Sequence, residues 1–275
     1  MIQTTKLSKA QAGDIRAFHE LFAEFEAQLK SYLYRLTARR NETEDLAQDV
    51  FILAFEGVKK FRQDADLKTW VFTIATNRAR RHLKKQARWR TDTFVKTRER
   101  AHSEAGLLDK IHHINDHSPQ GAYEIREHID YCFSCVGKML SLEQNIAILL
   151  KDVYAFKIDE IAEILQRTPA SVKHLVRDAR QTMIAIFDET CALVSKRGVC
   201  NQCSELNGRF NPKQDRQKEL MKIKMVKDRK KHNVESLLEL RAQLVRNIDP
   251  LQANGVDLHD SLMEINHRVN GTEHS

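Results

Sequence analysis

Cysteine is the residue type with the clearest chemical potential in this 275-residue chain. Cys132 and Cys135 form one pair separated by two residues, Cys200 and Cys203 form a second, and His128 stands one helical turn before the first. Thiolates and imidazoles at such spacings are the usual ligands of tetrahedral zinc sites. The pattern therefore predicts one structural zinc ion, held by Cys132, Cys135, Cys200 and Cys203, with His128 or Cys191 as alternate ligands.

The cellular compartment bears on how these thiols behave. No run of about 18 apolar residues occurs, and the N-terminal residues Met1–Lys6 lack the apolar core of a signal peptide. We therefore expect a cytoplasmic protein without membrane insertion. In a reducing compartment, paired cysteines indicate metal ligands or redox thiols before structural disulfides. The alternative is that Cys132 and Cys135 are small buried hydrophobic residues.

Composition predicts an all-α protein. Glycine (9) and proline (4) are scarce, amphipathic stretches are long, and alternating runs rich in Val, Ile and Thr do not occur. The net charge of +7 permits a polyanionic partner. No glycine-rich phosphate loop and no nucleophile–base set is present, so we do not expect an enzyme.

The chain is predicted to have four parts. Residues 8–90 and 124–190 form two helical domains, and residues 91–123, with a break at Asp116–Gly121, form a flexible linker. Residues 191–275 form a Cys-containing extension with a basic stretch at Lys213–Lys231. Two amphipathic segments follow at Val234–Ile248 and Leu258–Val269, and we expect them to pack on the first domain or the linker as a built-in regulator.

Within residues 41–55, the apolar and polar side chains separate onto two faces of a predicted helix. The polar face is either solvated or an acidic docking surface for a basic partner. It carries Asp45, Gln48, Asp49 and Ile52 at spacings of three and four residues.

The helix predicted from Leu67 ends in a strongly basic run. Seven cations fall within thirteen residues and no acid interrupts them: Arg78, Arg80, Arg81, Lys84, Lys85, Arg88 and Arg90. Because these charges repel one another, the run favours a nucleic-acid partner over a solvated face. Trp89 could stack on an unpaired base, whereas Trp70 is predicted to lie in the core.

Residues 140–187 have the pattern of a helix-turn-helix. Ser141 is a predicted N-cap, and a helix at Glu143–Val153 precedes a short helix at Ile158–Leu165. After a turn, a longer helix begins at Thr168 and Pro169 and runs to about Phe187. Its outward side chains suit the major groove of DNA: Ser171, Lys173, His174, Arg177 and Arg180.

These segments resemble the extracytoplasmic-function (ECF) group of RNA polymerase sigma factors, in the sigma-70 family. Asp45–Phe51 is similar to the polymerase-docking helix of sigma region 2, and Phe61–Arg80 to its promoter-melting and −10-reading segment. Leu140–Arg180 is similar to sigma region 4, which reads the −35 element. The resemblance covers about residues 10–90 and 125–187.

The resemblance implies an alternative sigma factor that binds core RNA polymerase and directs promoter-specific initiation. Its implied partners are the clamp coiled coil and flap of the polymerase, promoter DNA and an anti-sigma factor. The implied polymerase contacts are Asp45, Gln48, Asp49 and Ile52. The implied −10 and melting contacts are Phe61, Arg62, Asp64, Asn77, Arg78, Arg81 and Lys84. The implied −35 contacts are Ser171, Lys173, His174, Arg177 and Arg180.

The second domain departs from the family pattern. Gln166 stands in the turn where the family often has glycine, and Asp178 stands where a basic residue is frequent. Two other functions stay open. A stand-alone helix-turn-helix regulator would not need the acidic helix or the segment Asn77–Lys85, and a cytoplasmic zinc or thiol sensor would not need the basic run.

Overall fold

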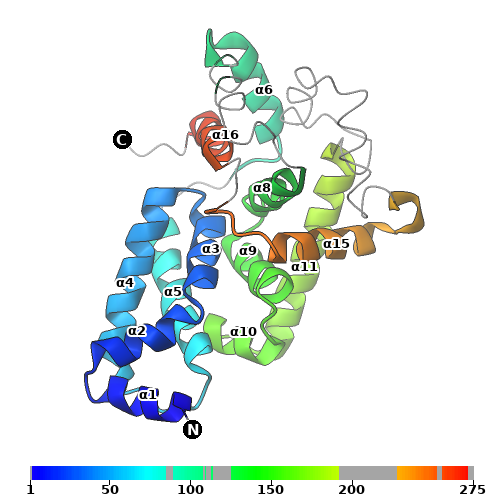
Figure 1. The fold of residues 1–275 in the computed structure, drawn as a ribbon. Coiled ribbons are helices and arrows are strands. Elements are labelled where there is room, and N and C mark those ends of the chain that lie inside the picture. Colours follow the sequence, from blue (N-terminus) through cyan, green and yellow to red (C-terminus); the bar gives the residue numbers. More distant parts are fainter. Residues whose placement is uncertain are drawn as a thin grey trace.

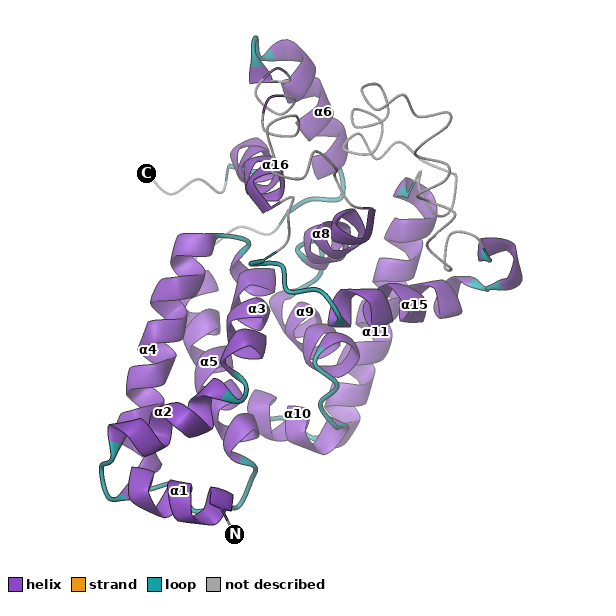
Figure 2. Ribbon diagram, viewed as in Figure 1, coloured by secondary structure: helices purple, strands orange, loops and turns teal. Residues whose placement is uncertain are grey.

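The computed structural model describes residues 2–84, 89–107, 109, 113, 125–191, 228–252 and 256–271. Within these residues the chain forms twelve α-helices, one π-helix and one 3-10 helix, and no strand (Figures 1 and 2). The all-α prediction is confirmed. No helix in the described part of the chain is long and apolar enough to cross a membrane.

The first five helices form one bundle (Figure 1). They are α1 (Ile2–Gln11), α2 (Ile15–Ala23), α3 (Glu26–Thr37), α4 (Arg40–Val58) and α5 (Leu67–Leu83). Helix α2 begins at Asp14, whose carboxylate accepts the backbone N–H groups of Arg16 and Ala17 at 2.9 and 3.1 Å. Aromatic rings join α2 to α4, with the buried Phe18 5.3 Å from the half-buried Phe51 between ring centroids. Trp70 is half-buried and packs on this core, as predicted.

The second group of helices contains the predicted helix-turn-helix. It comprises α8 (Ile125–Gly137), α9 (Leu142–Ile148), the π-helix η1 (Leu149–Val153), α10 (Ile158–Leu165) and α11 (Pro169–Thr190). Ser141 and Gln144 form a capping box at the start of α9. The Thr168 hydroxyl accepts the backbone N–H of Ser171 at 3.2 Å, which caps α11. The helix predicted at Glu143–Val153 is α-helical in its first part and a π-helix in its second.

The turn between α10 and α11 has a left-handed residue. Gln166 has φ of +54° and ψ of +49°, a conformation that glycine adopts at lower cost. The backbone N–H of Arg167 bonds to the carbonyl of Ala162 at 2.9 Å, which closes the last turn of α10. The departure from the family pattern at Gln166 therefore leaves the turn geometry in place.

The two groups pack directly on each other, with α10 against α5 (Figure 1). The rings of Phe72 on α5 and Phe156, just before α10, lie 4.9 Å apart. Lys68 lies 4.9 Å from the Phe156 ring, and burial lowers the pKa of its ammonium group. At the other end of α5, Arg80 donates to Glu143 on α9 at 2.7 Å. Apolar and charged contacts thus join the groups along most of α5.

The predicted linker at residues 91–123 contains a helix that the sequence analysis did not expect. Helix α6 spans Thr93–Ser103, and Thr93 and Thr97 on its buried side bond to Asn270 and Asn266 at 2.9 and 2.7 Å. These partners lie 177 and 169 residues along the chain, so the polar local sequence contains no sign of them.

The extension forms helices where amphipathic segments were predicted. Helix α15 spans Val234–Arg246 and packs on α8, η1 and α11, and α16 spans Val256–Val269 and packs on α6. Figure 1 shows α15 beside α11 and α16 beside α6. The 3-10 helix η3 (Arg229–Lys231) lies at the end of the predicted basic stretch, of which residues 213–227 are outside the described part.

Candidate functional site

Helix α4 presents an open surface of acidic, polar and apolar side chains. Leu46, Val50 and Ala54 are buried on its inner face. On the outer side, Asp45 and Gln48 are exposed, and Ile52 is exposed by 46%. Leu53 is also exposed, by 43%, so this helix presents two adjacent apolar side chains to solvent beside its polar ones.

Asp49 pairs with Arg78 on α5. The Arg78 guanidinium donates to the Asp49 carboxylate at 2.5 and 2.9 Å, and each side chain keeps 41% of its surface exposed. The structure thus joins one residue expected at a polymerase contact to one expected at a DNA contact. A second pair between the same helices links Glu42 to His82 at 2.7 Å.

The outward face of α5 carries three residues of the predicted −10 segment. Asn77, Arg81 and Lys84 follow at spacings of four and three residues, so they share one face. Arg81 and Lys84 are exposed. Asn77 is half-buried, and its side-chain oxygen lies 3.5 Å from a guanidinium nitrogen of Arg80. This face is available to a polyanion while α10 covers the neighbouring face of α5.

The remaining basic run departs from the expectation. Lys85 and Arg88 lie outside the described residues, and the exposed Arg90 pairs with Asp92 at 3.1 Å. Trp89 is 4% exposed, and its ring lies 5.5 Å from that of His267 in an edge contact with α16. The hypothesis that Trp89 stacks on a base is therefore wrong for this structure, because the extension covers its ring.

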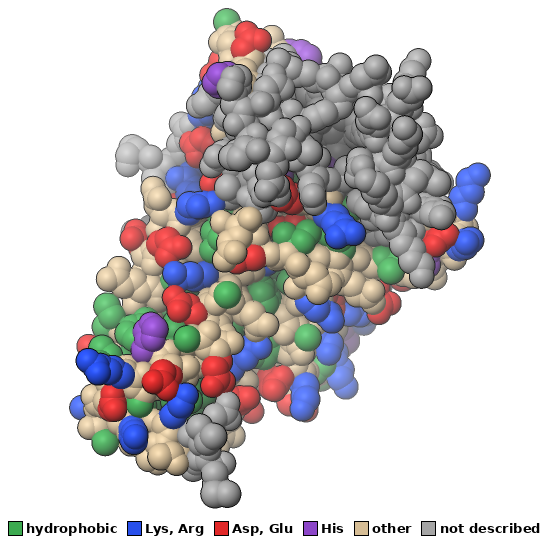
Figure 3. Space-filling view, viewed as in Figure 1, with side chains coloured by type: hydrophobic (Ala, Val, Ile, Leu, Met, Phe, Trp, Pro, Cys, Tyr) green, Lys and Arg blue, Asp and Glu red, His purple; other side chains and the backbone are tan. Residues whose placement is uncertain are grey.

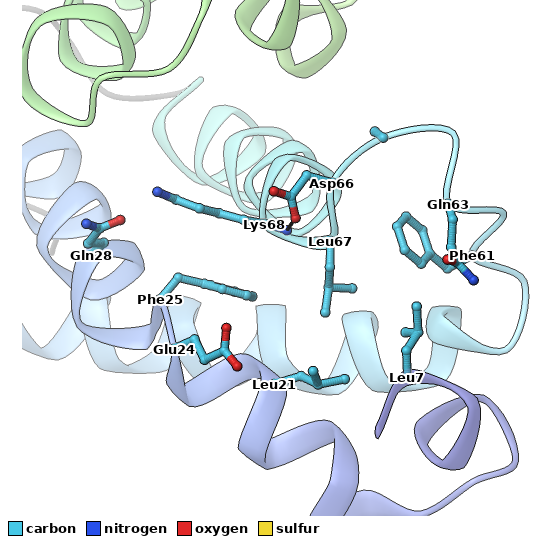
Figure 4. A pocket seen from close by; sticks show the side chains of 11 residues that line it. Leu7, Leu21, Glu24, Phe25, Gln28, Phe61, Gln63, Asp66, Leu67 and Lys68 are labelled. Carbon is cyan, nitrogen blue, oxygen red and sulfur yellow. Dashed lines mark hydrogen bonds between the residues drawn. The ribbon is translucent and has the colours of Figure 1, made fainter. Parts of the chain in front are cut away.

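A pocket of about 510 Å³ lies between α2 and the loop that precedes α5 (Figure 4). Phe61 and Gln63 come from the loop, while Leu21, Glu24 and Phe25 come from the opposite side. Further lining residues are Leu7, Gln28, Ala65, Asp66, Leu67 and Lys68. Among the lining residues, the apolar Leu7, Leu21, Phe25 and Phe61 are buried, whereas the polar Glu24, Gln28, Gln63 and Asp66 are exposed.

The structure brings only part of the predicted −10 set to this pocket. Phe61 is buried in the wall and packs 5.0 Å from the Trp70 ring, while Arg62 and Asp64 are exposed on the same loop and do not line it. Asn77 is ten residues beyond the start of α5, or about 15 Å along the helix. Asn77 is therefore placed on a separate surface from the loop.

The recognition helix α11 presents fewer unpaired cations than the sequence indicated. Lys173 and His174 are exposed, and Arg177 is exposed but pairs with its neighbour Asp178 at 2.9 Å. Arg180 donates twice to Asp152 at 2.8 and 2.5 Å, and these bonds raise the pKa of its guanidinium. Ser171 is half-buried at the capped first turn. In this structure Arg180 fastens α11 to η1.

The cysteines of the described chain are spread over two places. Cys132, half-buried, and Cys135, buried, lie on α8 with the buried His128, as predicted for one helix. Cys191 ends α11, and its sulfur accepts a bond from Arg241 at 3.4 Å. Cys200 and Cys203 lie outside the described residues. Within the described residues, no group of three or more Cys, His, Asp and Glu side chains is arranged to hold a metal ion.

Arg35 on α3 is a central residue that the sequence analysis missed. It is 1% exposed, and its guanidinium donates to Asp130 on α8 at 2.5 Å and to Tyr154 after η1 at 2.7 Å. Burial opposes its charge, but the carboxylate of Asp130 gives a net rise in the pKa of Arg35. The available signal was one arginine in the otherwise apolar run from Tyr32 to Leu36.

Comparison with protein families gives two matches in the order of the two helical groups. The family described as sigma-70 region 2 matches residues 21–89, and the family described as sigma-70, region 4 matches residues 138–183. The chain belongs to the sigma-70 family of RNA polymerase sigma factors. Both matches end before α15 and α16, so the extension of this sigma factor lies outside them.

Similar sigma factors agree with the expected ECF group. The RNA polymerase sigma-H factor of Pseudomonas aeruginosa is 26% identical over 178 residues, which cover 64% of this chain and 89% of that one. The ECF RNA polymerase sigma-E factor of Haemophilus influenzae is 24% identical over 176 residues, with the same coverage. The solved structure of CnrH in complex with the cytosolic domain of CnrY is 17% identical and covers 67% of this chain and 96% of that one, with a TM-score of 0.48.

Proposed function

We propose that this sigma factor binds core RNA polymerase through the outer face of α4 and directs promoter-specific transcription initiation. The observation that supports this most strongly is the exposed Ile52 beside Asp45 and Gln48, on a helix whose inner face is fully packed. Packing fixes the helix, so the outer side chains meet a partner with little loss of conformational entropy. Their acidic character suits a basic coiled coil.

The −10 element is assigned to α5 and to the loop before it. Arg81 and Lys84 would neutralise phosphates, and Asn77 lies on the same face between them and the exposed loop. The pocket walled by Phe61 would receive a base that has left the stack, because an apolar wall and polar rims can offset an unstacking cost of a few kcal/mol. In the view of Figure 3, acidic and basic side chains are interspersed, without one large basic patch.

The −35 element is assigned to α11. Lys173 and His174 are the exposed side chains of its first half, and they would contact base edges or phosphates in the major groove. Arg177 would reach the DNA after leaving Asp178. Arg180 is assigned a positioning role, since its two bonds to Asp152 hold the helix in place.

The remaining proposals concern the whole chain. Residues 8–90 would act as sigma region 2 and residues 124–190 as sigma region 4, with residues 91–123 between them and residues 191–275 as the extension. The protein would act in the cytoplasm and carry no catalytic step of its own. Cys132 and Cys135 would supply two ligands of a zinc ion with Cys200 and Cys203, and elemental analysis of freshly reduced protein tests that site.

Core binding measured by fluorescence anisotropy tests the assignment of α4. The double variant Asp45→Lys/Ile52→Asp should weaken binding of purified bacterial core polymerase at least tenfold, because it reverses a charge and places a carboxylate in an apolar contact. The exposed Glu99→Lys on α6 is the matched control and should bind as wild type does. Unchanged affinity in the double variant would overturn the assignment, and tight binding to intact duplex alone would favour a stand-alone regulator.

A further inference from the structure

The extension contacts both sigma regions at once. Two backbone carbonyls at the end of α15 accept bonds from Arg35 on α3. That of Val245 lies in the last turn of the helix, at 3.2 Å, and that of Ile248 lies just after it, at 3.0 Å. Arg246 of the same helix donates to the carbonyl of Asp152 in η1 at 2.7 Å. One short segment of the extension therefore bonds to region 2 and region 4 side by side.

Arg35 is a residue at which both sigma regions and the extension meet. Its partners are Asp130 on α8, Tyr154 after η1 and the end of α15, and each of these lies at least 95 residues from it in sequence. Tyr154 also bonds to the Ser31 hydroxyl at 2.8 Å, and its ring packs edge-on to Tyr32 at 5.6 Å. A buried guanidinium that lost these acceptors would leave an uncompensated charge in the core, so α3, α8, η1 and α15 hold together as a unit.

Helix α16 adds a second set of bonds to region 2. Tyr34 donates to Asp260 at 2.6 Å, and Arg40 at the start of α4 lies 3.8 Å from the same carboxylate. Arg40 also donates to the carbonyl of Leu251, between α15 and α16, at 3.2 Å. The extension is thus fastened to α3 and α4 independently of Arg35.

This closed arrangement does not match the geometry of a promoter. The −10 and −35 elements lie about 25 base pairs apart, or about 85 Å at 3.4 Å per base pair. Helix α10 packs on both α5 and α11, and packed helix axes lie about 10 Å apart, so the two reading helices are separated by about 20 Å. DNA with a persistence length of about 150 base pairs cannot fold 25 base pairs to that spacing.

We propose that α15 and α16 are a latch in cis, which holds regions 2 and 4 closed and must leave the Arg35 junction before both promoter elements are bound. The surface made by α3, the start of α4 and η1 is the binding site of this latch. This role of the extension is separate from the proposed contacts with polymerase and DNA. Those contacts could form whether or not the extension restrains regions 2 and 4. A competing role, in which the extension stabilises the active form, predicts the opposite effect of loosening it.

The test loosens the latch in the full-length chain. Arg246→Ala/Asp260→Ala removes the bonds to Asp152, Tyr34 and Arg40 and alters no residue assigned to polymerase or DNA. Gln243→Ala/Glu264→Ala is the matched control, because both side chains are exposed on the same two helices. A second loosened variant, Tyr34→Phe/Arg40→Ala, removes the bonds from region 2 to Asp260 and to the Leu251 carbonyl, and it serves if the first fails to fold.

Two measurements decide the outcome. The loosened variants should show a larger radius of gyration by small-angle X-ray scattering, and their affinity for core polymerase should rise at least about tenfold, because a larger fraction can engage both sites. A compact profile with unchanged or weaker binding, at wild-type helicity, would overturn the latch. Adding Asp45→Lys to a loosened variant separates the two proposals. If it leaves the gain intact, the α4 docking surface is wrong while the latch stands.

Discussion

Arg78 on α5 binds Asp49 on α4 through two hydrogen bonds, so residues expected to contact DNA and polymerase satisfy each other in the free protein. Both side chains keep 41% of their surface exposed, and a pair in that position contributes only about 0.5–1 kcal/mol to stability. Partners of higher charge density can therefore displace it. The pair couples the polymerase surface to the DNA surface through one shared arginine.

This coupling predicts that Asp49→Asn strengthens binding of a single-stranded −10 oligonucleotide, since it frees Arg78 for phosphate. Arg78→Ala should weaken that binding and reduce the slope of log affinity against log salt by about 0.7. Fluorescence anisotropy at several salt concentrations measures both effects, with the exposed Arg126→Ala on α8 as the control. If Asp49→Asn bound no more tightly than wild type, Arg78 would have no role at the phosphates.

Arg180 and Lys173 should separate stability from DNA affinity on one helix. Arg180→Ala leaves the buried carboxylate of Asp152 without its two charged bonds, and unfolding in urea should become easier by about 1–2 kcal/mol. Lys173→Ala should leave the urea midpoint unchanged. It should instead weaken binding to duplex DNA and lower the salt slope by about 0.9.

The reverse pattern would exchange the roles of the two residues. If Lys173→Ala lowered the urea midpoint and Arg180→Ala changed only the salt slope, the positioning role of Arg180 would be wrong. Arg180→Lys adds a further check, because lysine keeps the charge and loses the bidentate geometry, and should recover less than half of the lost stability.

The helix-turn-helix was predictable because its signals are local. Ser141, Thr168 and Pro169 mark helix starts within one turn of the groups they cap, and the predicted bounds of the short helix, Ile158–Leu165, are those of α10. The outer face of α4 followed in the same way from side chains three and four residues apart. Patterns of this kind depend only on neighbouring residues in the sequence, so they can be recognised without the tertiary fold.

The long-range parts of the structure were not predictable from such patterns. The apolar run around Arg35 hints at burial, but its carbonyl acceptors at the end of α15 lie 210 residues later in the sequence. The polar segment of α6 resembles a linker in sequence, because the asparagine partner of Thr97 lies on α16. The burial of Trp89 has the same cause, since the ring that contacts it edge-on belongs to His267 of α16. The extension determines each of these environments, and it lies beyond both family matches.

Acid should loosen the extension through His259 of α16. The imidazole is buried, stacks on Tyr131 of α8 at 4.9 Å, and its pKa is lowered from 6.5 to about 3, first by burial and then by the charge of His128. Between those values the unfolded chain binds a proton that the folded chain does not, so stability falls as the pH falls below 6.5. The titration of His259 alone lowers the free energy of unfolding at pH 5.5 by about 1.4 kcal/mol.

His259→Phe isolates this contribution, because phenylalanine keeps a flat ring against Tyr131 and cannot take up a proton. The difference in unfolding free energy between pH 7.5 and pH 5.5, measured in urea, should be smaller in the variant by about 1.4 kcal/mol. The exposed His174→Phe on α11 controls for the loss of one imidazole. Equal pH dependence in His259→Phe and wild type would show that His259 is solvated in the folded protein, and that α16 does not pack on α8 as described.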